Sequence, residues 1–339
     1  MNKNVYKYDD MKRQEHMAVR KTAGWYLFTH ELVEVKGKDA AAFLDYICTN
    51  PIANLKPGKE RYTVILDEKG GIMDDVVIFR RGDQEFWIST LFTSYMLPWL
   101  DAHKGDYKVE YKNITKTRHM YAVQGPKSLE MVNALVKKPV DDLKFFSFAD
   151  NAIDGVPVMV NRAGFTGEKF GYEIYIAADK ADFLEGKLRE AAKKVNAREV
   201  TDIQIIAWTL PTEAGFYYMR DLRHCTPFEV GLANNINWDK EFVGKEALLK
   251  LKEAGPAREM VGFTLEEADV RITGKDLGGP GGVVTVSGKE AGRVSKFNYS
   301  YVLEKPVGYI LARKGTMKAG DHVTINDKYD ALIVERPFI

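Results

Sequence analysis

The chain has 339 residues, with 49 lysines and arginines against 48 aspartates and glutamates, so its formal net charge is only +1. A charge this close to zero gives no reason to expect nucleic acid or an anionic membrane as the main partner. The chain is longer than one hydrophobic core usually supports, which predicts two or three domains.

The first residues, MNKNVYKYDDMKRQEHMAVRK, are charged throughout and contain no apolar segment typical of a secretory signal. No apolar run approaches the roughly 18 residues that a membrane span requires. Cys48 and Cys225 lie far apart and form no C-x-x-C pair, which gives no support for a disulfide framework or a zinc site. These features predict a cytoplasmic protein, and the six scattered histidines predict no metal site.

The first part of the chain alternates strands and helices. A strand is predicted over 24–35, followed by a helix over 38–50. Turns at Pro57-Gly58, Gly70-Gly71 and Gly82-Asp83 then separate three short strands, which predict an antiparallel meander. Helices near 93–103 and 126–138, with a strand around HMYAVQG between them, complete an α+β block.

A second α+β block begins with VPVMVNRAGFTGEKFGYEIYI, which predicts two strands around a Thr-Gly turn. The amphipathic segment DKADFLEGKLREAAKKV and residues 200–215 are predicted helices, and Pro211 should kink or end the second one. From residue 258 to the end, short Val- and Ile-rich runs between Gly and Asp predict a small all-β domain.

Two adjacent acids, Asp74 and Asp75, interrupt the apolar strand of GGIMDDVVIF. Successive strand side chains point to opposite faces, so one of the two carboxylates must lie on the face that packs on the core. Burying a carboxylate is costly unless it is paired or hydrogen-bonded. The residues alone leave two explanations open, a structural bond to the turn or backbone and a functional site.

Two further acids stand beside aromatic residues: Glu168 in AGFTGEKFGYE and Glu213 in LPTEAGFYYMRDL. Glu213 lies on the apolar face of its predicted helix, one turn after Leu210. A functional carboxylate and a buried ion pair with a nearby arginine both explain this position.

Several stretches together resemble one family. AGWYLFTHELVEVKGKDAAAFL is similar to an A-G-x-x-x-x-S-H opening, LKPGKERYTVILDEKGGIMDD to a hairpin with G-G-x-x-D-D, and RAGFTGEKFGYEIY to R-x-G-Y-T-G-E-x-G-F-E. EAG, TPFEVGL, EFVGKEALL and GRVSKFNYSYVLEKPVGYI follow in the same order. This order over some 300 residues resembles the folate-dependent aminomethyltransferase family, typified by the T-protein of the glycine cleavage system.

The resemblance implies an α+β cloverleaf of three domains with folate in a central channel. We predict a discontinuous first α+β domain over 1–50 plus 140–250, a second over 51–139, and a C-terminal all-β domain, similar to a β-barrel, over 251–339.

The resemblance also implies roles for the acids. Asp75 is expected to face the folate channel as the catalytic carboxylate, with Asp74 as its outward neighbour. Glu213 is expected to accept hydrogen bonds from the pterin amine and ring N–H, Tyr62 to form a wall of the pocket, and Glu168 to belong to the same binding set. Paired N–H donors suit a carboxylate, and N5 must lose a proton as it gains carbon.

The sequence departs from the family pattern A-R-D-x-L-R-x-E-A-G at IAWTLPTEAG, where Ala207, Trp208 and Pro211 replace two arginines and an aspartate. Leu27 likewise replaces an aspartate of the opening motif. These changes favour a tetrahydrofolate-dependent transferase that takes a methyl or other one-carbon group from a small molecule. The alternative is an aminomethyltransferase whose partner is a lipoyl H-protein. A folate-binding iron-sulfur assembly protein is a third possibility, although its K-G-C-Y-x-G-Q-E motif is absent.

Overall fold

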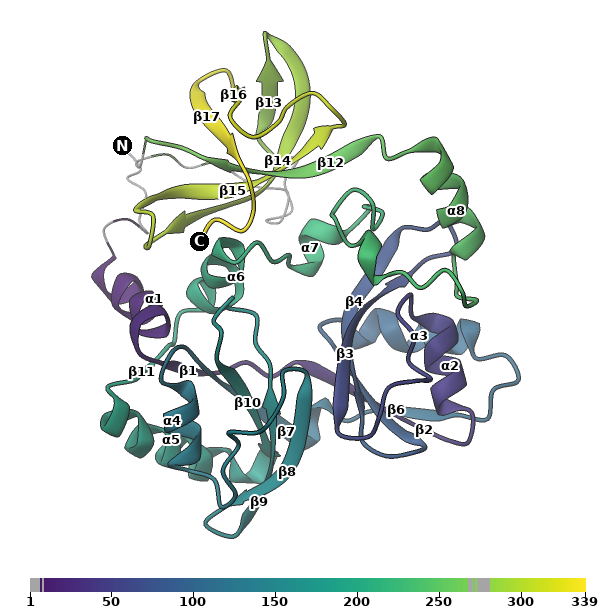
Figure 1. The fold of residues 1–339 in the computed structure, drawn as a ribbon, viewed down its shortest axis with the longest axis vertical. Coiled ribbons are helices and arrows are strands. Elements are labelled where there is room, and N and C mark those ends of the chain that lie inside the picture. Colours follow the sequence, from purple (N-terminus) through teal and green to yellow (C-terminus); the bar gives the residue numbers. More distant parts are fainter. Residues whose placement is uncertain (1–6, 8, 268–269, 271, 273–280) are drawn as a thin grey trace.

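Three lobes surround a central region in the computed structural model, which describes residues 7, 9–267, 270, 272 and 281–339. Figure 1 shows two α+β lobes below and a β-barrel above them, with short helices between. This arrangement confirms the predicted α+β fold with a C-terminal barrel.

The first lobe is a sheet covered by helices on one face. Its strands are β1 (Gly24–Leu27), β7 (Arg118–Gln124), β8 (Ser147–Ile153), β9 (Val156–Arg162), β10 (Gly171–Ala177) and β11 (Arg198–Glu199). Helices α4 (Ser128–Asn133) and α5 (Ala181–Val195) pack on it through an apolar cluster that includes Val160, Ile174 and Leu188. Helix α1 (Asp10–Lys21), which the sequence patterns did not predict, precedes β1.

The second lobe contains the predicted meander. Strands β3 (Lys59–Leu66), β4 (Ile72–Arg80) and β5 (Glu85–Thr90) pair antiparallel in sequence order. Strands β2 (Glu31–Lys36) and β6 (Glu110–Asn113) extend this sheet, and helices α2 (Ala40–Ile47) and α3 (Thr93–His103) cover one face. The turns at the glycine-containing pairs therefore lie where the sequence placed them.

The two lobes share one 11-stranded sheet, in the order β11-β1-β7-β10-β9-β8-β3-β4-β5-β2-β6. Because β2 pairs with β5, and β7 pairs with β1 and β10, the chain changes lobe near residues 28–30 and 114–117. The predicted domain boundaries at 50 and 139 differ from this pairing. The local patterns that predict a strand do not specify its distant partner, so they could not locate these crossings.

The C-terminal lobe is a closed barrel in the order β12-β15-β14-β13-β16-β17. Its strands are β12 (Arg258–Thr264), β13 (Val283–Val286), β14 (Lys289–Ser300), β15 (Lys305–Arg313), β16 (His322–Ile325) and β17 (Tyr329–Val334). Apolar residues such as Phe263, Val294 and Ile310 fill it, and closure leaves no exposed sheet edge. Helix α8 (Lys245–Ala254) precedes it.

Short helices connect the second α+β block to the barrel. A π-helical turn (Ile205–Thr209) is followed by α6 (Leu210–Glu213), α7 (Met219–Leu222) and a 3-10 turn at Ala233–Asn235. Two other 3-10 turns lie outside this connection, at Thr115–Thr117 and Ala178–Lys180. Pro211 has no N–H with which to continue an α-helical bond, and the wide turn lies directly before it. Pro211 lies in the first turn of α6, which continues to Glu213, so the proline does not end the helix as one form of the prediction had it, and the irregularity lies in the π-helical turn before it.

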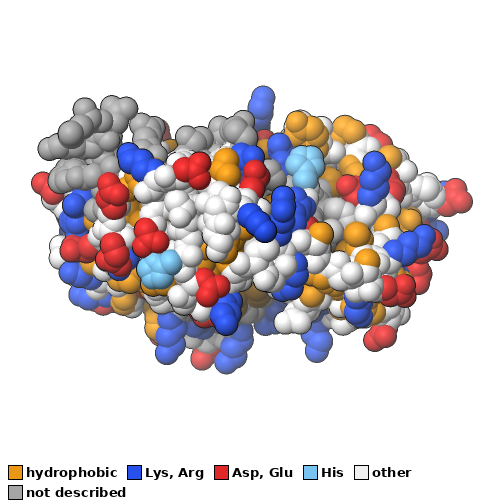
Figure 2. Space-filling view, turned by 90° about the horizontal axis from the view of Figure 1, so that it is seen from above, with side chains coloured by type: hydrophobic (Ala, Val, Ile, Leu, Met, Phe, Trp, Pro, Cys, Tyr) orange, Lys and Arg blue, Asp and Glu red, His pale blue; other side chains and the backbone are white. Residues whose placement is uncertain are grey.

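The outer surface has no single-sign charged field on the face shown in Figure 2, where basic and acidic side chains are interspersed. Among the described residues, none of the helices has the length and apolar character needed to cross a membrane. Cys48 and Cys225 are buried, and neither forms a disulfide within the described part of the chain.

A buried ion pair joins the barrel to α7. Lys296 Nζ of β14 lies 2.6 Å from Asp221 Oδ2, and both side chains are 0% exposed. Asp221 also accepts a hydrogen bond from the backbone N–H of Tyr218 at 2.9 Å. The barrel is therefore attached to helix α7 by an ion pair that is excluded from water.

Asp221→Ala should lower the free energy of unfolding by about 3–5 kcal/mol, because it leaves the Lys296 ammonium buried without its counter-charge. Glu266→Ala removes one partner of the exposed Lys305–Glu266 pair and should change it by less than about 1 kcal/mol. Urea denaturation of both variants measures the difference. Equal effects in the two variants would contradict the role given to the buried pair.

Candidate functional site

A cavity of about 820 Å³ lies where the three lobes meet. Alternate residues of β4 and β10 face it, as the two-residue repeat of a strand requires, and residues 60–62 of β3 line it as well. Loops near 163–165, 214–217, 230–235 and 336–337 close it. Many of the residues that line it are polar or aromatic, among them Glu60, Arg61, Tyr62, Asp75, Phe79, Ser89, Phe145, Phe146, Asn161, Phe165, Glu173, Tyr175, Tyr217 and Arg336. Such a cavity is large enough for a small-molecule ligand.

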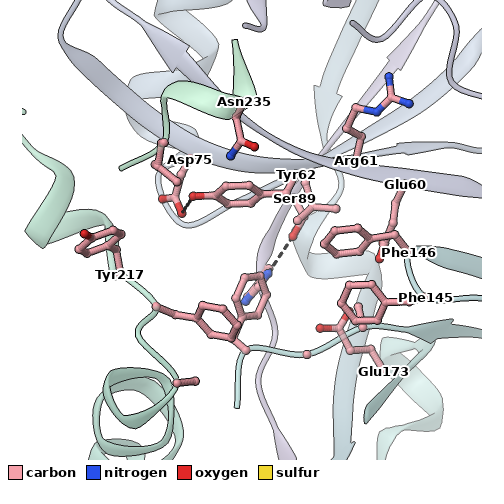
Figure 3. Close-up of a pocket in the computed structure, with 18 of the residues that line it drawn as sticks. Glu60, Arg61, Tyr62, Asp75, Ser89, Phe145, Phe146, Glu173, Tyr217 and Asn235 are labelled. Atoms are coloured by element: carbon pink, nitrogen blue, oxygen red, sulfur yellow. Dashed lines mark hydrogen bonds between the residues drawn. The ribbon is translucent and has the colours of Figure 1, made fainter. Parts of the chain in front are cut away.

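Asp75 lines this cavity, and the Tyr62 hydroxyl donates a hydrogen bond to its Oδ2 at 3.1 Å (Figure 3). The two residues are cross-strand neighbours on β3 and β4 and face the same side of the sheet. Burial raises the pKa of Asp75 to about 6, although the bond from Tyr62 favours the ionised form. Asp75 is thus a carboxylate that titrates near neutral pH inside a cavity.

Asp74 corrects the expectation of an outward neighbour, because its side chain is only 2% exposed. It points to the opposite face of β4, where helices α2 and α3 cover the sheet, and accepts a hydrogen bond from Thr90 Oγ1 at 2.5 Å. Burial, followed by the charge of Asp75, raises the pKa of Asp74 to about 7. Both faces of this sheet are covered, so Asp74 is buried under the helices and Asp75 is half-buried at the cavity.

His30 adds a second group near Asp75. Its Nδ1 lies 2.8 Å from Ser89 Oγ, and both residues line the cavity. Burial lowers the pKa of His30 to about 4, so its ring is neutral at physiological pH. His30 packs edge-on against Phe28, with ring centroids 5.0 Å apart.

Glu173 lies on the far side of the cavity from Asp75 in the view of Figure 3. Its Oε2 accepts hydrogen bonds from Asn161 Nδ2 at 2.9 Å and from the Tyr175 hydroxyl at 3.3 Å. Burial raises the pKa of Glu173 to about 6, and the bond from Asn161 opposes that rise. Three cavity carboxylates, those of Glu60, Asp75 and Glu173, are thus available to N–H donors.

A second, smaller cavity of about 70 Å³ adjoins the first at His30, Tyr62 and Asp75. Its other walls are mainly apolar and include Phe28, Leu91, Ile206, Ala207, Pro211 and Tyr218. Ala207 and Pro211 are two of the positions where the sequence departs from the family pattern. Asp75 lies at the junction of this smaller cavity with the large one.

Glu213 does not line either cavity and is 0% exposed. Its Oε2 contacts His16 Nε2 and Arg20 Nη2, each at 2.8 Å, and its Oε1 accepts from Ser300 Oγ at 2.5 Å. Burial opposes ionisation, yet the hydrogen bond and charge of His16 and the charge of Arg20 hold the pKa of Glu213 below its usual value. This is the buried ion pair that the sequence left open as the alternative.

Glu168 belongs to the same cluster rather than to the cavity lining. Its Oε1 accepts a hydrogen bond from Arg20 Nη1 at 2.7 Å, and its side chain is partly buried. The structure therefore brings Asp75 and Tyr62 together at the cavity, and gathers Glu168 and Glu213 around Arg20.

Sequence analysis missed three cavity residues: His30, Glu60 and Glu173. Two of them had a signal, because His30 ends the stretch that resembles the A-G-x-x-x-x-S-H opening, and Glu173 is the last acid of RAGFTGEKFGYE. The signal for Glu60 was weaker: it lies two residues before Tyr62 on the same strand, so the two side chains share a face.

Comparison with known proteins gives consistent matches. The model of the GCVT N-terminal domain family matches residues 3–240. The aminomethyltransferase of Thermotoga sp. (strain RQ2) is 32% identical over 338 residues, which cover 96% of this chain and 88% of that protein. The aminomethyltransferase of Alkaliphilus oremlandii (strain OhILAs) is 34% identical over 309 residues, which cover 88% of this chain and 80% of that protein.

A solved structure supports the fold. The glycine cleavage system aminomethyltransferase T from Bartonella henselae superposes with a TM-score of 0.84 at 24% identity, covering 97% of this chain and 89% of that one. Fold, cavity and sequence together define an enzyme of the transferase class. The chain belongs to the aminomethyltransferase family, which confirms the predicted family and the prediction of an enzyme.

Asp74→Asn should make the protein less sensitive to pH. Because the folded-state pKa of Asp74 is raised to about 7, its contribution to stability is present at low pH and is lost as pH rises through 7. The variant, which cannot ionise, should gain about 2 to 3 kcal/mol relative to wild type between pH 5 and pH 8.

Urea denaturation at the two pH values measures this gain, with the exposed Asp106→Asn as the control for loss of a charge. An Asp74→Asn effect of equal size at pH 5 and pH 8 would show that Asp74 is not held in its neutral form by the fold.

Proposed function

We propose that this enzyme transfers a one-carbon group to N5 of tetrahydrofolate, with Asp75 as the carboxylate beside the reacting nitrogen. The observation that supports this most directly is the position of Asp75 at the junction of two cavities, a large one for the acceptor and a small one for the donor. A group placed there can act on a carbon that passes between them.

The cavity suits tetrahydrofolate, which combines a flat N–H-rich ring with an anionic tail. Glu173 offers a carboxylate to the pterin amine and ring N–H, and aromatic rings such as Phe165 and Tyr175 line the walls. Arg61 and Arg336 also line the cavity and can pair with the tail carboxylates. We therefore assign the pterin-binding role to Glu173, and a structural role to Glu213 and Glu168.

Tetrahydrofolate supplies the nucleophilic N5 that receives the carbon. Asp75 can orient this amine, offset the positive charge that develops on it, and accept its proton. With a pKa of about 6, the carboxylate is mostly ionised at neutral pH yet remains a competent base. The Tyr62 hydroxyl fixes its orientation, and neutral His30 adds no competing positive charge.

An aminomethyl group is the first candidate for the transferred carbon, because the relatives that match most of this chain are aminomethyltransferases. By this proposal a lipoyl H-protein delivers the group, and methylene-tetrahydrofolate and ammonia are the products.

A small methylated molecule is the second candidate donor. The smaller cavity, which we call the donor chamber, favours it. Apolar Ala207 and Pro211 form part of its wall where the family pattern has arginines, and Tyr218 and Phe28 add aromatic surface. Aromatic faces attract methylated cations, and apolar walls suit a methoxylated ring. The volume of about 70 Å³ limits the part of the donor that enters to a small group.

Asp75→Asn should lower turnover by about 10² or more while keeping the fold, because it replaces a charge at the reacting nitrogen by a near-isosteric amide. In the wild-type enzyme kcat/KM should rise with pH up to about 6 and then level, and this rise should be absent in the variant. Steady-state kinetics from pH 5 to 8 measure both effects. Turnover within a factor of three of wild type would exclude Asp75 as the catalytic carboxylate.

The donor is identified by the mass of the folate product. Purified enzyme and tetrahydrofolate are incubated with aminomethylated H-protein, and separately with methylated sulfonium compounds, methylamines and methoxylated aromatics. A methylene product at about 1 s⁻¹ or faster is expected for the first candidate, whereas a methyl product identifies the second.

Ala207→Arg is the matched variant, because its long side chain should fill the donor chamber. It should abolish transfer from a small molecule and leave the affinity for reduced folate within about twofold. The absence of any folate product with every donor would contradict the proposed function.

A further inference from the structure

Glu60 is a buried acid that makes no ion pair in the described part of the chain. It lies on β3, lines the large cavity and is 4% exposed. Neither of its carboxylate oxygens makes a hydrogen bond of good geometry to a described residue, although the nearby Asn161 side chain favours its ionised form. A buried polar group of this kind is costly for the fold and calls for a specific explanation.

The surroundings of Glu60 offer further acceptors rather than a counter-charge. In Figure 3 it lies on the same side of the cavity as Glu173, next to the rings of Phe145 and Phe146. Asn161, which donates to Glu173, has its own Oδ1 buried with no hydrogen-bond partner in the part of the chain that the structure describes. Burial, and then the charge of Glu173, raise the pKa of Glu60 well above its usual value. This end of the cavity therefore has unused acceptors.

On the basis of the proposed function, we propose that Glu60 is a specificity residue. With Glu173 it forms a subsite of two carboxylates that binds the N–H-rich edge of a reduced pterin and disfavours the oxidised ring.

The chemistry of the pterin ring gives this subsite its selectivity. A tetrahydropterin carries N–H groups at N2, N3, N5 and N8, whereas the fully oxidised ring keeps them only at N2 and N3. One carboxylate can accept from the adjacent N2 and N3 donors, which both rings possess. The second carboxylate then requires a further donor, and the oxidised ring presents the lone pair of N8 instead. A site built to accept a hydrogen bond rejects a ligand that lacks the donor.

A purely structural role makes the opposite prediction for stability. A structural carboxylate would be bonded within the fold, as Glu213 is, and its loss would destabilise the protein. Glu60 lacks such bonds among the described residues, so a neutral replacement should relieve a cost in the free protein. Affinity should fall while the melting temperature stays equal or rises.

The test uses Glu60→Gln, which keeps the shape of the side chain and removes its charge. Calorimetry measures the binding of 5-formyltetrahydrofolate, a stable reduced folate that keeps N8–H, and of oxidised folic acid. Wild type should prefer the reduced ligand, and the variant should reduce this preference at least tenfold by weakening the reduced folate alone. Glu253→Gln, at an exposed position of α8, is the control and should match wild type.

The outcomes separate this inference from the function on which it rests. Failure of wild type to bind any reduced folate would overturn the proposed function. If wild type binds reduced folate, three results in Glu60→Gln would overturn the role of Glu60. These are an unchanged preference for the reduced ligand, an equal loss of affinity for both ligands, or a clearly lowered melting temperature of the variant. If the Gln variant does not fold, Glu60→Ala removes the same acceptor without adding a donor and should show the same loss of preference.

Discussion

One buried ion pair, between Arg20 and Glu213, lies at the centre of the contacts that join the first lobe to the barrel. Arg20 of α1 also donates to the Thr166 carbonyl in the first lobe, while Glu213 accepts from Ser300 in the barrel. The backbone carbonyl of Glu213 accepts in turn from Phe338 near the C-terminus. Arg20 also pairs with Glu168, and Glu213 also contacts His16, so these side chains form one buried network, and removing Glu213 should be costly because Arg20 and His16 both lose this acceptor. The central space persists because the lobes are joined at its margin.

The chemistry of that space follows from the two-residue repeat of strands. Alternate side chains of β3, β4 and β10 place Glu60, Tyr62, Asp75 and Glu173 on one continuous face of the shared sheet. Buried carboxylates in such numbers oppose folding, and their raised pKa values express that cost. A ligand rich in N–H donors removes this cost by donating hydrogen bonds to the carboxylates. The free protein is thus less stable than it would be if apolar side chains filled this space.

The sequence predicted what depends on local pattern. The meander, α3, the C-terminal barrel and the family all followed from turn residues, periodicity and ordered motifs, and the structure and comparisons confirm them. The resemblance assigned pterin binding to Glu213, which lines neither cavity, and its partners His16 and Arg20 could not be foreseen because they lie almost two hundred residues away in the chain. The burial of Asp74 depends likewise on α2 and α3 covering the second face of the sheet. Pairing across such distances is a property of the fold rather than of any segment.

The most direct test of this account is a crystal structure of the enzyme with 5-formyltetrahydrofolate. The account predicts that the N2 and N3 edge of the pterin lies within about 3 Å of the Glu173 carboxylate, and that N5 lies on the side of Asp75 and Tyr62. It also predicts that the Arg20–Glu213 pair stays intact. A pterin bound against Glu213, or with N5 turned away from Asp75, would contradict it.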